Sequence, residues 1–277
     1  IMNRREKLII EAGKNESNYW IDIWSFRELF YILSWRDIKV RYKQTVIGLL
    51  WSFIKPFLTM IIFTVIFSKV AGLESDPNTP YSLLVFCGLL PWHFFSTAFV
   101  NGSESLISNR NLLTKIYFPR LILPVSAIIT SLIDFFISLV ILFGLMVYYK
   151  FVPSSDIFYL PIFILLAILL SVAFGTLFAA LNVQFRDFRY IIPFIVQLGT
   201  YVSPVGFSSN VVTEKWQLLF NLNPIVSLID GFRWSILGGS NSFDVKYFLI
   251  SFITTMFYLL IAIYVFRRME KKMADII

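Results

Sequence analysis

Two charged side chains lie inside long apolar runs, where charge is rare. Lys55 falls within the run Val46–Val70, and Asp134 falls within Leu121–Tyr149. At 1.5 Å per helical residue, the two lie about 14 Å and about 20 Å into their runs, near the middle of a bilayer. A charge there costs about 2.5–3.5 kcal/mol on insertion scales, so it usually faces protein or water and finds a partner. We therefore predict that Lys55 and Asp134 pair or share a hydrated cavity; the alternative is that each is solvated separately.

Small and polar residues recur at helical spacing around both charges and in a later apolar run. Such stripes most often form helix–helix contacts. Three of them in one bundle are also what a polar conduit requires. The stripes are Gly48, Ser52, Lys55 and Thr59; Ser126, Thr130, Asp134 and Ser138; and Gln197, Tyr201 and Pro204.

Aromatic residues make up 18% of the chain. Most of this content is typical of interfacial belts and lipid-facing surface, and a single ring is more often structural than functional. Rings that face a conduit would offer flat apolar surfaces to the C–H faces of sugars; the candidates are Trp51, Phe57, Tyr201, Trp216 and Trp234. The predicted channel lining comprises Trp51, Ser52, Lys55, Phe57, Thr59, Asp134, Gln197 and Tyr201.

The single histidine and the single cysteine indicate packing rather than chemistry. His93 has no second metal ligand at useful spacing, and Cys87, inside an apolar run, cannot form an intrachain disulfide. The sequence holds no G-x-x-x-x-G-K-[ST] loop, serine elbow, H-E-x-x-H or paired-carboxylate motif. We predict no catalytic, cofactor or metal site in this chain. If ATP powers its activity, another polypeptide binds the ATP and Mg²⁺.

The composition is that of a membrane protein. Of 277 residues, 57% are hydrophobic and 15% charged, against about 25% charged in soluble domains. The mean hydropathy is +0.74. The net charge of +7 is spread over the flanks of apolar runs, which argues against a nucleic-acid partner. Without strand-like alternation, we predict an all-α polytopic protein whose six spans are Val46–Val70, Tyr81–Val100, Leu121–Tyr149, Ile157–Leu181, Tyr190–Phe207 and Tyr247–Phe266.

The distribution of cations predicts the orientation. With six spans, both termini lie on one side, and that side carries eighteen of the 24 Lys and Arg residues against five on the other. Positive charge near spans stays in the cytoplasm, so both ends are predicted to be cytoplasmic. The predicted domains are an N-terminal cytoplasmic segment 1–45, a transmembrane domain 46–266 and a basic cytoplasmic tail 267–277.

Three segments outside the spans are predicted to form helices of special kinds. About 20–33, with Trp20 and Trp24, is an amphipathic helix in the headgroup region, or else a packed helix of a small subdomain. About 101–117 is too polar for lipid and ends at a proline, so it is a short cytoplasmic helix. About 212–240 holds two short apolar pieces split by Asn223-Pro224. These form a re-entrant hairpin against a pathway, or two helices on the outer surface.

The chain resembles the membrane subunits of type-2 ABC exporters for polysaccharides, the O-antigen, capsule and teichoic-acid permeases. The resemblance covers nearly the whole chain. Its most specific part is WRDIKVRYKQT at 35–45 with Gly48, Trp51 and Pro56. Supporting matches are Asn111–Leu113, Phe118-Pro119-Arg120, Arg186-Asp187-Phe188 and Asn223-Pro224. Lys55 departs from the pattern, which has an uncharged residue there, so no role for it carries over.

The resemblance implies a homodimer with a continuous channel, docked on two copies of a nucleotide-binding ATPase, in the bacterial inner membrane. It implies that 20–33 is an interface helix and 101–117 a coupling helix. ATP-driven closure of the partner would push on that coupling helix, and a lipid-linked glycan would pass outward. The coupling residues would be Glu104, Asn109, Arg110, Asn111, Tyr117, Arg120, Arg186 and Asp187, and the re-entrant gate Trp216, Asn223, Pro224 and Trp234.

The leading hypothesis is thus the permease subunit of an ATP-driven exporter of lipid-linked polysaccharide of the O-antigen type. The alternatives are a type-2 ABC permease for a small amphiphile or drug, and an ion-coupled transporter that uses Lys55 and Asp134. A membrane-embedded glycan enzyme is a further possibility.

Overall fold

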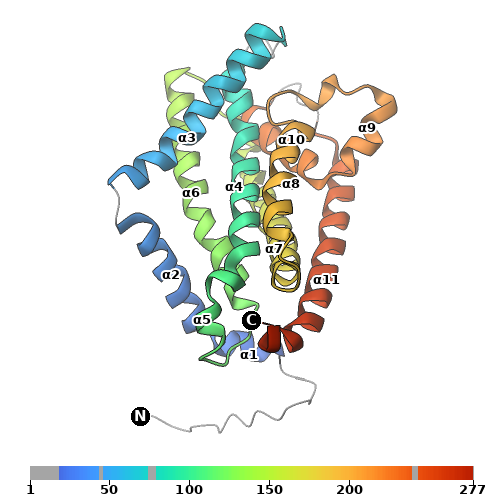
Figure 1. The fold of residues 1–277 in the computed structure, drawn as a ribbon. Helices are drawn as coiled ribbons and strands as arrows, with labels where there is room; N and C mark the ends of the chain where they lie inside the picture. The colour runs from blue at the N-terminus through green and yellow to red at the C-terminus, as the bar shows by residue number, and fades with distance from the viewer. Residues whose placement is uncertain (1–18, 44–45, 74–78, 239–242, 277) are drawn as a thin grey trace.

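The computed structural model describes residues 19–43, 46–73, 79–238 and 243–276, and within these ranges the chain is helical without a strand (Figure 1). The prediction of an all-α polytopic membrane protein is confirmed. In chain order the elements are α1 (Tyr19–Ser25), α2 (Arg27–Lys43), α3 (Val46–Thr64), η1 (Val65–Val70), α4 (Tyr81–Ser108), α5 (Arg110–Leu113), α6 (Ile122–Tyr148), η2 (Ser155–Tyr159), α7 (Leu160–Gln184), α8 (Phe188–Val202), η3 (Ser209–Val211), α9 (Glu214–Asn221), α10 (Pro224–Leu237) and α11 (Val245–Ile276).

Five helices in the described ranges are long and apolar enough to cross a membrane: α3 with η1, α4, α6, η2 with α7, and α11. They coincide with five of the six predicted spans. The remaining predicted span, Tyr190–Phe207, is shorter in the structure because α8 ends at Val202. Its 15 residues reach about 22 Å. Ser203 is extended, as expected for a residue before proline, and the chain from Ser203 to Gly206 is buried irregular backbone.

Helix α4 forms the centre of the bundle (Figure 1). It is apolar on all sides and almost entirely buried, and it packs against α6, α7 and α10. An all-round apolar helix is stable only when neighbours cover every face. The contact with α7 is close where Gly102 faces Gly175, since a Cβ at Gly102 would lie 3.2 Å from the Gly175 Cα.

The predicted coupling helix at 101–117 has a different form in the structure. Residues 101–108 are the last turns of α4, α5 has only four residues, and 115–119 are not helical. The polar composition marks an exit from lipid, but no helix-breaking residue stops α4 before Asn109. The segment therefore continues the long central helix, and motion of this end would be passed directly along α4.

The N-terminal helix is longer than the predicted 20–33. Helices α1 and α2 together run from Tyr19 to Lys43, with a turn at Phe26 across which backbone hydrogen bonds continue. Trp20 and Trp24 are 56% and 72% exposed, as expected for rings at a membrane boundary. Tyr19 is buried against the end of α11, under the Arg267 guanidinium at 4.6 Å. The two ends of the described chain therefore lie at the same end of the bundle (Figure 1).

The predicted hairpin at 212–240 consists of two unlike helices. Helix α9 exposes most of its side chains, whereas α10 is buried and packs against α4, α7 and α11. Asn223 caps α10 by accepting a hydrogen bond from the Ile225 N–H at 3.1 Å, Pro224 occupies the first turn, and Gly238 ends the helix with φ +62°. Only the second arm thus enters the bundle.

Candidate functional site

The carboxylate of Asp134 holds together three helices. Arg41 Nη1 of α2 lies 2.8 Å from Asp134 Oδ2. On the other oxygen, Tyr42 Oη donates at 2.5 Å and Ser52 Oγ of α3 donates at 3.1 Å. Burial, reinforced by Asp134, raises the pKa of Tyr42 to about 12, so Tyr42 remains a neutral donor at physiological pH.

The ion-pair partner of Asp134 is therefore Arg41 and not Lys55, which corrects the first form of the prediction. The reason is the course of α2, which continues past 33 and packs along α6. The second form of the prediction, a shared cavity, agrees with the structure. Lys55 and Asp134 line one cavity of about 300 Å³ between α2, α3, α4 and α6.

This inner cavity also brings together other predicted lining residues. Trp51, Ser52, Lys55 and Asp134 all contribute to its wall. The remaining wall comes from Arg41, Pro56, Leu90, His93, Phe94, Thr97, Ser131, Phe135 and Ser138. His93, expected only to pack, thus faces the cavity region, and its Nε2 is buried without a hydrogen-bond partner in the described chain.

A second, lower cavity of about 500 Å³ lies between α2, α4 and α6, toward the end of the bundle that carries the chain ends. Arg41 lines both cavities. In the lower one, Arg36 donates to Asn109 Oδ1 at 2.8 Å and pairs with Asp37 at 2.7 Å. Glu104, predicted for coupling, is on the same wall. The two cavities share Arg41 in their linings, and together they line what we call the polar route, from the end of α4 to the level of Lys55.

The other predicted lining residues do not reach these cavities. Phe57 and Thr59 are on α3, where Thr59 donates to the Lys55 carbonyl at 2.8 Å. Gln197 and Tyr201 are exposed on α8. These residues lie on faces that no described part of the chain covers, so a lining role for them requires a second copy.

Most of the predicted coupling residues are exposed. They are Glu104, Arg110, Asn111, Tyr117, Arg186 and Asp187. Arg120 is instead tied to the end of α11: its backbone N–H donates to Glu270 Oε1 at 2.8 Å, and its guanidinium donates to the Glu270 carbonyl at 2.5 Å. The turn before α6 and the last turns of α11 are thereby joined.

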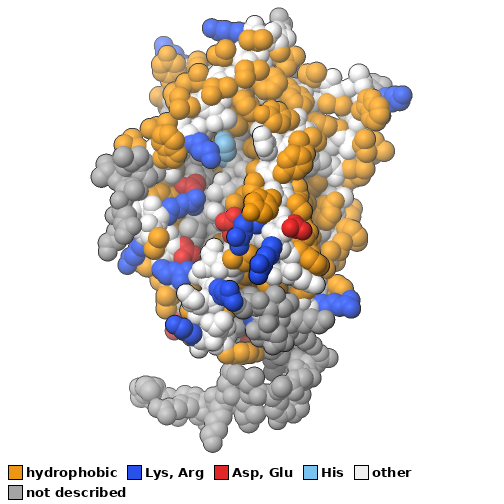
Figure 2. Space-filling view, viewed as in Figure 1, with side chains coloured by type: hydrophobic (Ala, Val, Ile, Leu, Met, Phe, Trp, Pro, Cys, Tyr) orange, Lys and Arg blue, Asp and Glu red, His pale blue; other side chains and the backbone are white. Residues whose placement is uncertain are grey.

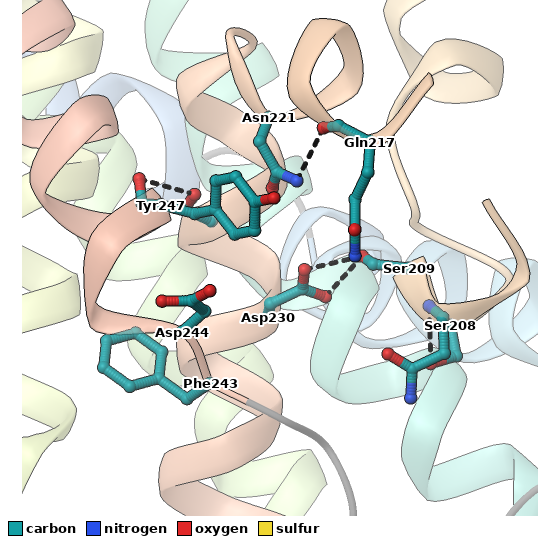
Figure 3. A pocket seen from close by; sticks show the side chains of 10 residues that line it. Ser208, Ser209, Gln217, Asn221, Asp230, Phe243, Asp244 and Tyr247 are labelled. Carbon is teal, nitrogen blue, oxygen red and sulfur yellow. Dashed lines mark hydrogen bonds between the residues drawn. The ribbon is translucent and has the colours of Figure 1, made fainter. Parts of the chain in front are cut away.

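A third polar pocket, of about 140 Å³, lies at the opposite end of the bundle between η3, α9, α10 and the start of α11 (Figure 3). Both carboxylate oxygens of Asp230 accept from Ser209 Oγ, at 2.7 and 2.6 Å. Of the predicted gate residues, Trp216 is exposed on α9, Asn223 and Pro224 begin α10, and Trp234 stacks on Phe243 with ring centroids 4.7 Å apart.

Arg233 of α10 is the main residue that sequence reasoning missed. Its side chain is 1% exposed and donates to three backbone carbonyls, those of Leu84 at 3.1 Å, Val205 at 2.9 Å and Phe207 at 2.7 Å. Asp230 Oδ1 lies 4.0 Å away. The sequence does contain a signal for this residue, because an Asp and an Arg at positions i and i+3 of an apolar helix lie on one face. Charged residues in such a helix normally face the protein interior and pair with one another.

The charged side chains gather toward one end of the face shown in Figure 2, over α2 and the ends of the long helices, while hydrophobic side chains cover most of the rest. A helical bundle with this surface, several apolar helices of membrane-spanning length and a polar route beside its central helix is a multi-pass membrane protein of the transporter class.

Comparison with known proteins agrees with this class. The family model for ABC-2 type transporters matches residues 28–237. The chain is 32% identical over 214 residues to the O-antigen export system permease protein RfbA of Myxococcus xanthus, covering 76% of this chain and 81% of that one. It is 28% identical over 251 residues to the RfbA of Klebsiella pneumoniae, covering 90% and 95%. It is 21% identical over 245 residues to the polysialic acid transport protein KpsM of Escherichia coli, covering 86% and 92%. The chain belongs to the ABC-2 type transporter family.

Proposed function

We propose that this chain is the permease subunit of an ATP-driven exporter that moves lipid-linked polysaccharide, of the O-antigen type, across the bacterial inner membrane. The polar route formed by the inner and lower cavities carries the proposal, because it begins beside the predicted coupling residues and reaches the level of Lys55. The names of the relatives supply the substrate class. Energy comes from a separate ATPase with bound ATP and Mg²⁺, because this sequence has no phosphate-binding loop.

The proposed assembly contains two copies of this chain and two ATPase subunits. Helix α8 supports the second copy: it carries the exposed polar Gln197 beside exposed Tyr201 and Phe194, and lipid is a poor environment for such a stripe. The ATPase would contact Glu104, Arg110 and Asn111, which are exposed at the end of α4 and on α5. The cytoplasm lies on this side in the proposal, as the cation distribution predicts.

Mild extraction of the native complex tests the proposal, with mass spectrometry of the co-purifying proteins. We expect a stoichiometric partner with a G-x-x-x-x-G-K-[ST] motif, and loss of surface glycan in cells lacking this chain. Substitutions of Glu104 or Arg110 should weaken the partner's binding or glycan export, whereas Lys150→Gln at the opposite end should change neither. If these coupling variants leave both intact, the proposal is wrong.

The alternatives predict other results. A permease for a small amphiphile would show ATP hydrolysis stimulated by drugs and not by glycan. An ion-coupled transporter would work after ATP depletion and stop when the proton gradient collapses. The second alternative uses Lys55 and Asp134, but the Asp134 carboxylate already has Arg41, Tyr42 and Ser52 as partners.

A further inference from the structure

The inner cavity holds an excess of positive charge. The charged or titratable groups that face it are Arg41 from α2, Lys55 from α3, His93 from α4 and Asp134 from α6. Asp134 is the only carboxylate among the described lining residues, and its ion pair is with Arg41. Lys55 therefore has no carboxylate partner in the described chain.

An ammonium group near the middle of a membrane requires compensation. Charged side chains at this depth normally pair or face water, and they mark substrate pathways. Lys55 lies beside a cavity of about 300 Å³, which would hold roughly ten waters at ~30 Å³ each. This volume is large enough for a hydrated polyatomic anion, whereas a cavity that holds a single water molecule would be too small.

The other lining groups suit an oxyanion. Thr97 and His93 both line the cavity, and the buried Nε2 of His93 has no hydrogen-bond partner in the described part of the chain. Lysine offers three donors, and hydroxyl and imidazole groups offer one each. Lys55 supplies the positive charge, while the neutral hydroxyl and imidazole groups add hydrogen bonds of defined direction. A phosphoryl group, with several acceptor oxygens, matches this set.

The route into the cavity has the same character. Arg41 stands where the inner and lower cavities meet, and Arg36 lines the lower one. Each of these arginines is already paired with an aspartate. They can therefore contact a passing anion without binding it tightly. The excess charge appears only at the inner end, at Lys55.

We propose that Lys55, with Thr97 and His93, forms a binding site for a phosphoryl anion in the inner cavity. The site deepens the proposed function, on which it rests for its physiological ligand: the phosphate or diphosphate that joins a glycan to its lipid.

The test uses the full chain, with any subunits that remain bound, in nanodiscs of zwitterionic phosphatidylcholine. Trp51 lines the same cavity, so its fluorescence reports on ligands there; the Trp51→Phe variant identifies its share of the signal. The probes are farnesyl diphosphate, farnesol and inorganic pyrophosphate. We expect farnesyl diphosphate to change the Trp51 signal saturably and farnesol to have no such effect.

The variants assign this binding to the lysine. Lys55→Gln should weaken the binding of farnesyl diphosphate roughly tenfold or more, as expected for a lost charge-assisted hydrogen bond, and Lys55→Arg should retain most of it. The matched control is Lys69→Gln, in η1 and outside the cavity lining, which should bind as the unchanged chain does. Equal binding by Lys55→Gln, or equal signals from farnesol and its diphosphate, would overturn the proposal.

Further arms identify the source of the phosphoryl group. Lys55-dependent binding of pyrophosphate as tight as that of farnesyl diphosphate supports the site and indicates a free anion. Competition by phosphatidylglycerol in the nanodisc supports it and indicates a phospholipid headgroup. Preference for the prenyl diphosphate in both comparisons indicates a lipid-linked substrate. None of these measurements requires glycan export, so failure here leaves the proposed function standing. Conversely, loss of the proposed function leaves a measured Lys55 site intact.

Discussion

Two charged residues of this protein are neutralised in different ways. Asp134 is partly exposed and collects one cation and two hydroxyl donors from α2 and α3. Arg233 is fully buried and is satisfied mainly by backbone carbonyls. The first arrangement links helices beside a polar cavity and can reorganise with it. The second fixes irregular backbone, because carbonyls at 205 and 207 have no helical partners of their own.

The Arg41–Asp134 pair should behave as a coupled unit. We expect Arg41→Gln and Asp134→Asn each to lower the free energy of unfolding. The loss in the double variant should be smaller than the sum of the two single losses by about 1–2 kcal/mol. The reason is that either single change leaves a charge without its partner beside the inner cavity. Thermal unfolding of the four proteins in one detergent measures this difference. Strictly additive losses would show that the two charges do not interact.

Arg233 should be essential for folding of the end of the bundle that carries η3 and α9. Arg233→Met leaves the Val205 and Phe207 carbonyls without this donor, removes a second donor from the Leu84 carbonyl and leaves Asp230 without its nearby cation, so we expect a loss of about 3–5 kcal/mol. Arg189→Met removes an exposed cation from α8 and serves as control, with a change within about 0.5 kcal/mol. Melting temperatures, monitored as the loss of the monodisperse size-exclusion peak after heating, distinguish the Arg233→Met and Arg189→Met variants. A stable Arg233→Met variant would mean that the carbonyls find other donors.

At the scale of elements, α4 connects the two ends of the molecule. Its final turns line the lower cavity, its middle lines the inner cavity, and its first turns contact Arg233 of α10 through the Leu84 carbonyl. A long buried helix packed on three neighbours moves as a unit. Displacement of its lower end by an ATPase would therefore reach α10 without passing through a loop.

The α4–α10 contact depends on a small residue. A Cβ at Gly88 would lie 2.5 Å from Arg233 Nη2 and 2.7 Å from the Val205 carbonyl. We expect Gly88→Ala to destabilise the protein by about 1–3 kcal/mol through overpacking. Gly144→Ala meets nothing within 4 Å on α6, so it should be neutral or stabilising by up to about 1 kcal/mol. Comparing the two melting temperatures tests the contact. A Gly88→Ala protein no less stable than Gly144→Ala would contradict it.

What the sequence predicts well is the set of helices, because long apolar runs leave few alternatives in lipid. It also places Ser52, Lys55 and Asp134 in one cavity, since they belong to stripes at helical spacing, and Trp51 joins them as an aromatic candidate. It misses the partner of Asp134, since Arg41 is 93 residues away and nothing local indicates how far α2 continues. The carbonyl contacts of Arg233 are equally hidden, because they depend on where α8 ends and irregular backbone begins.

At the scale of the whole molecule, charge and polarity divide the bundle into two ends. The last turns of α4, α5 and the end of α11 lie at one end, where Arg36 bonds to Asn109, while η3, α9 and the first turn of α10 lie at the other (Figure 1). The cation excess at the first end predicts that it is cytoplasmic. The polar route then opens on the side where ATP and newly made glycan are found, as export requires.

Cysteine labelling can test this orientation with little background, because Cys87 is fully buried. We would introduce one cysteine at a time: Glu28→Cys on α2, Val152→Cys between α6 and α7, and Val211→Cys in η3, all at exposed positions. A membrane-impermeant maleimide should label the cysteines at 152 and 211 in intact spheroplasts and the cysteine at 28 only after permeabilisation. The reverse pattern would place the lower cavity outside the cell, where neither an ATPase nor a lipid-linked precursor could supply it, and the export direction would have to be rejected.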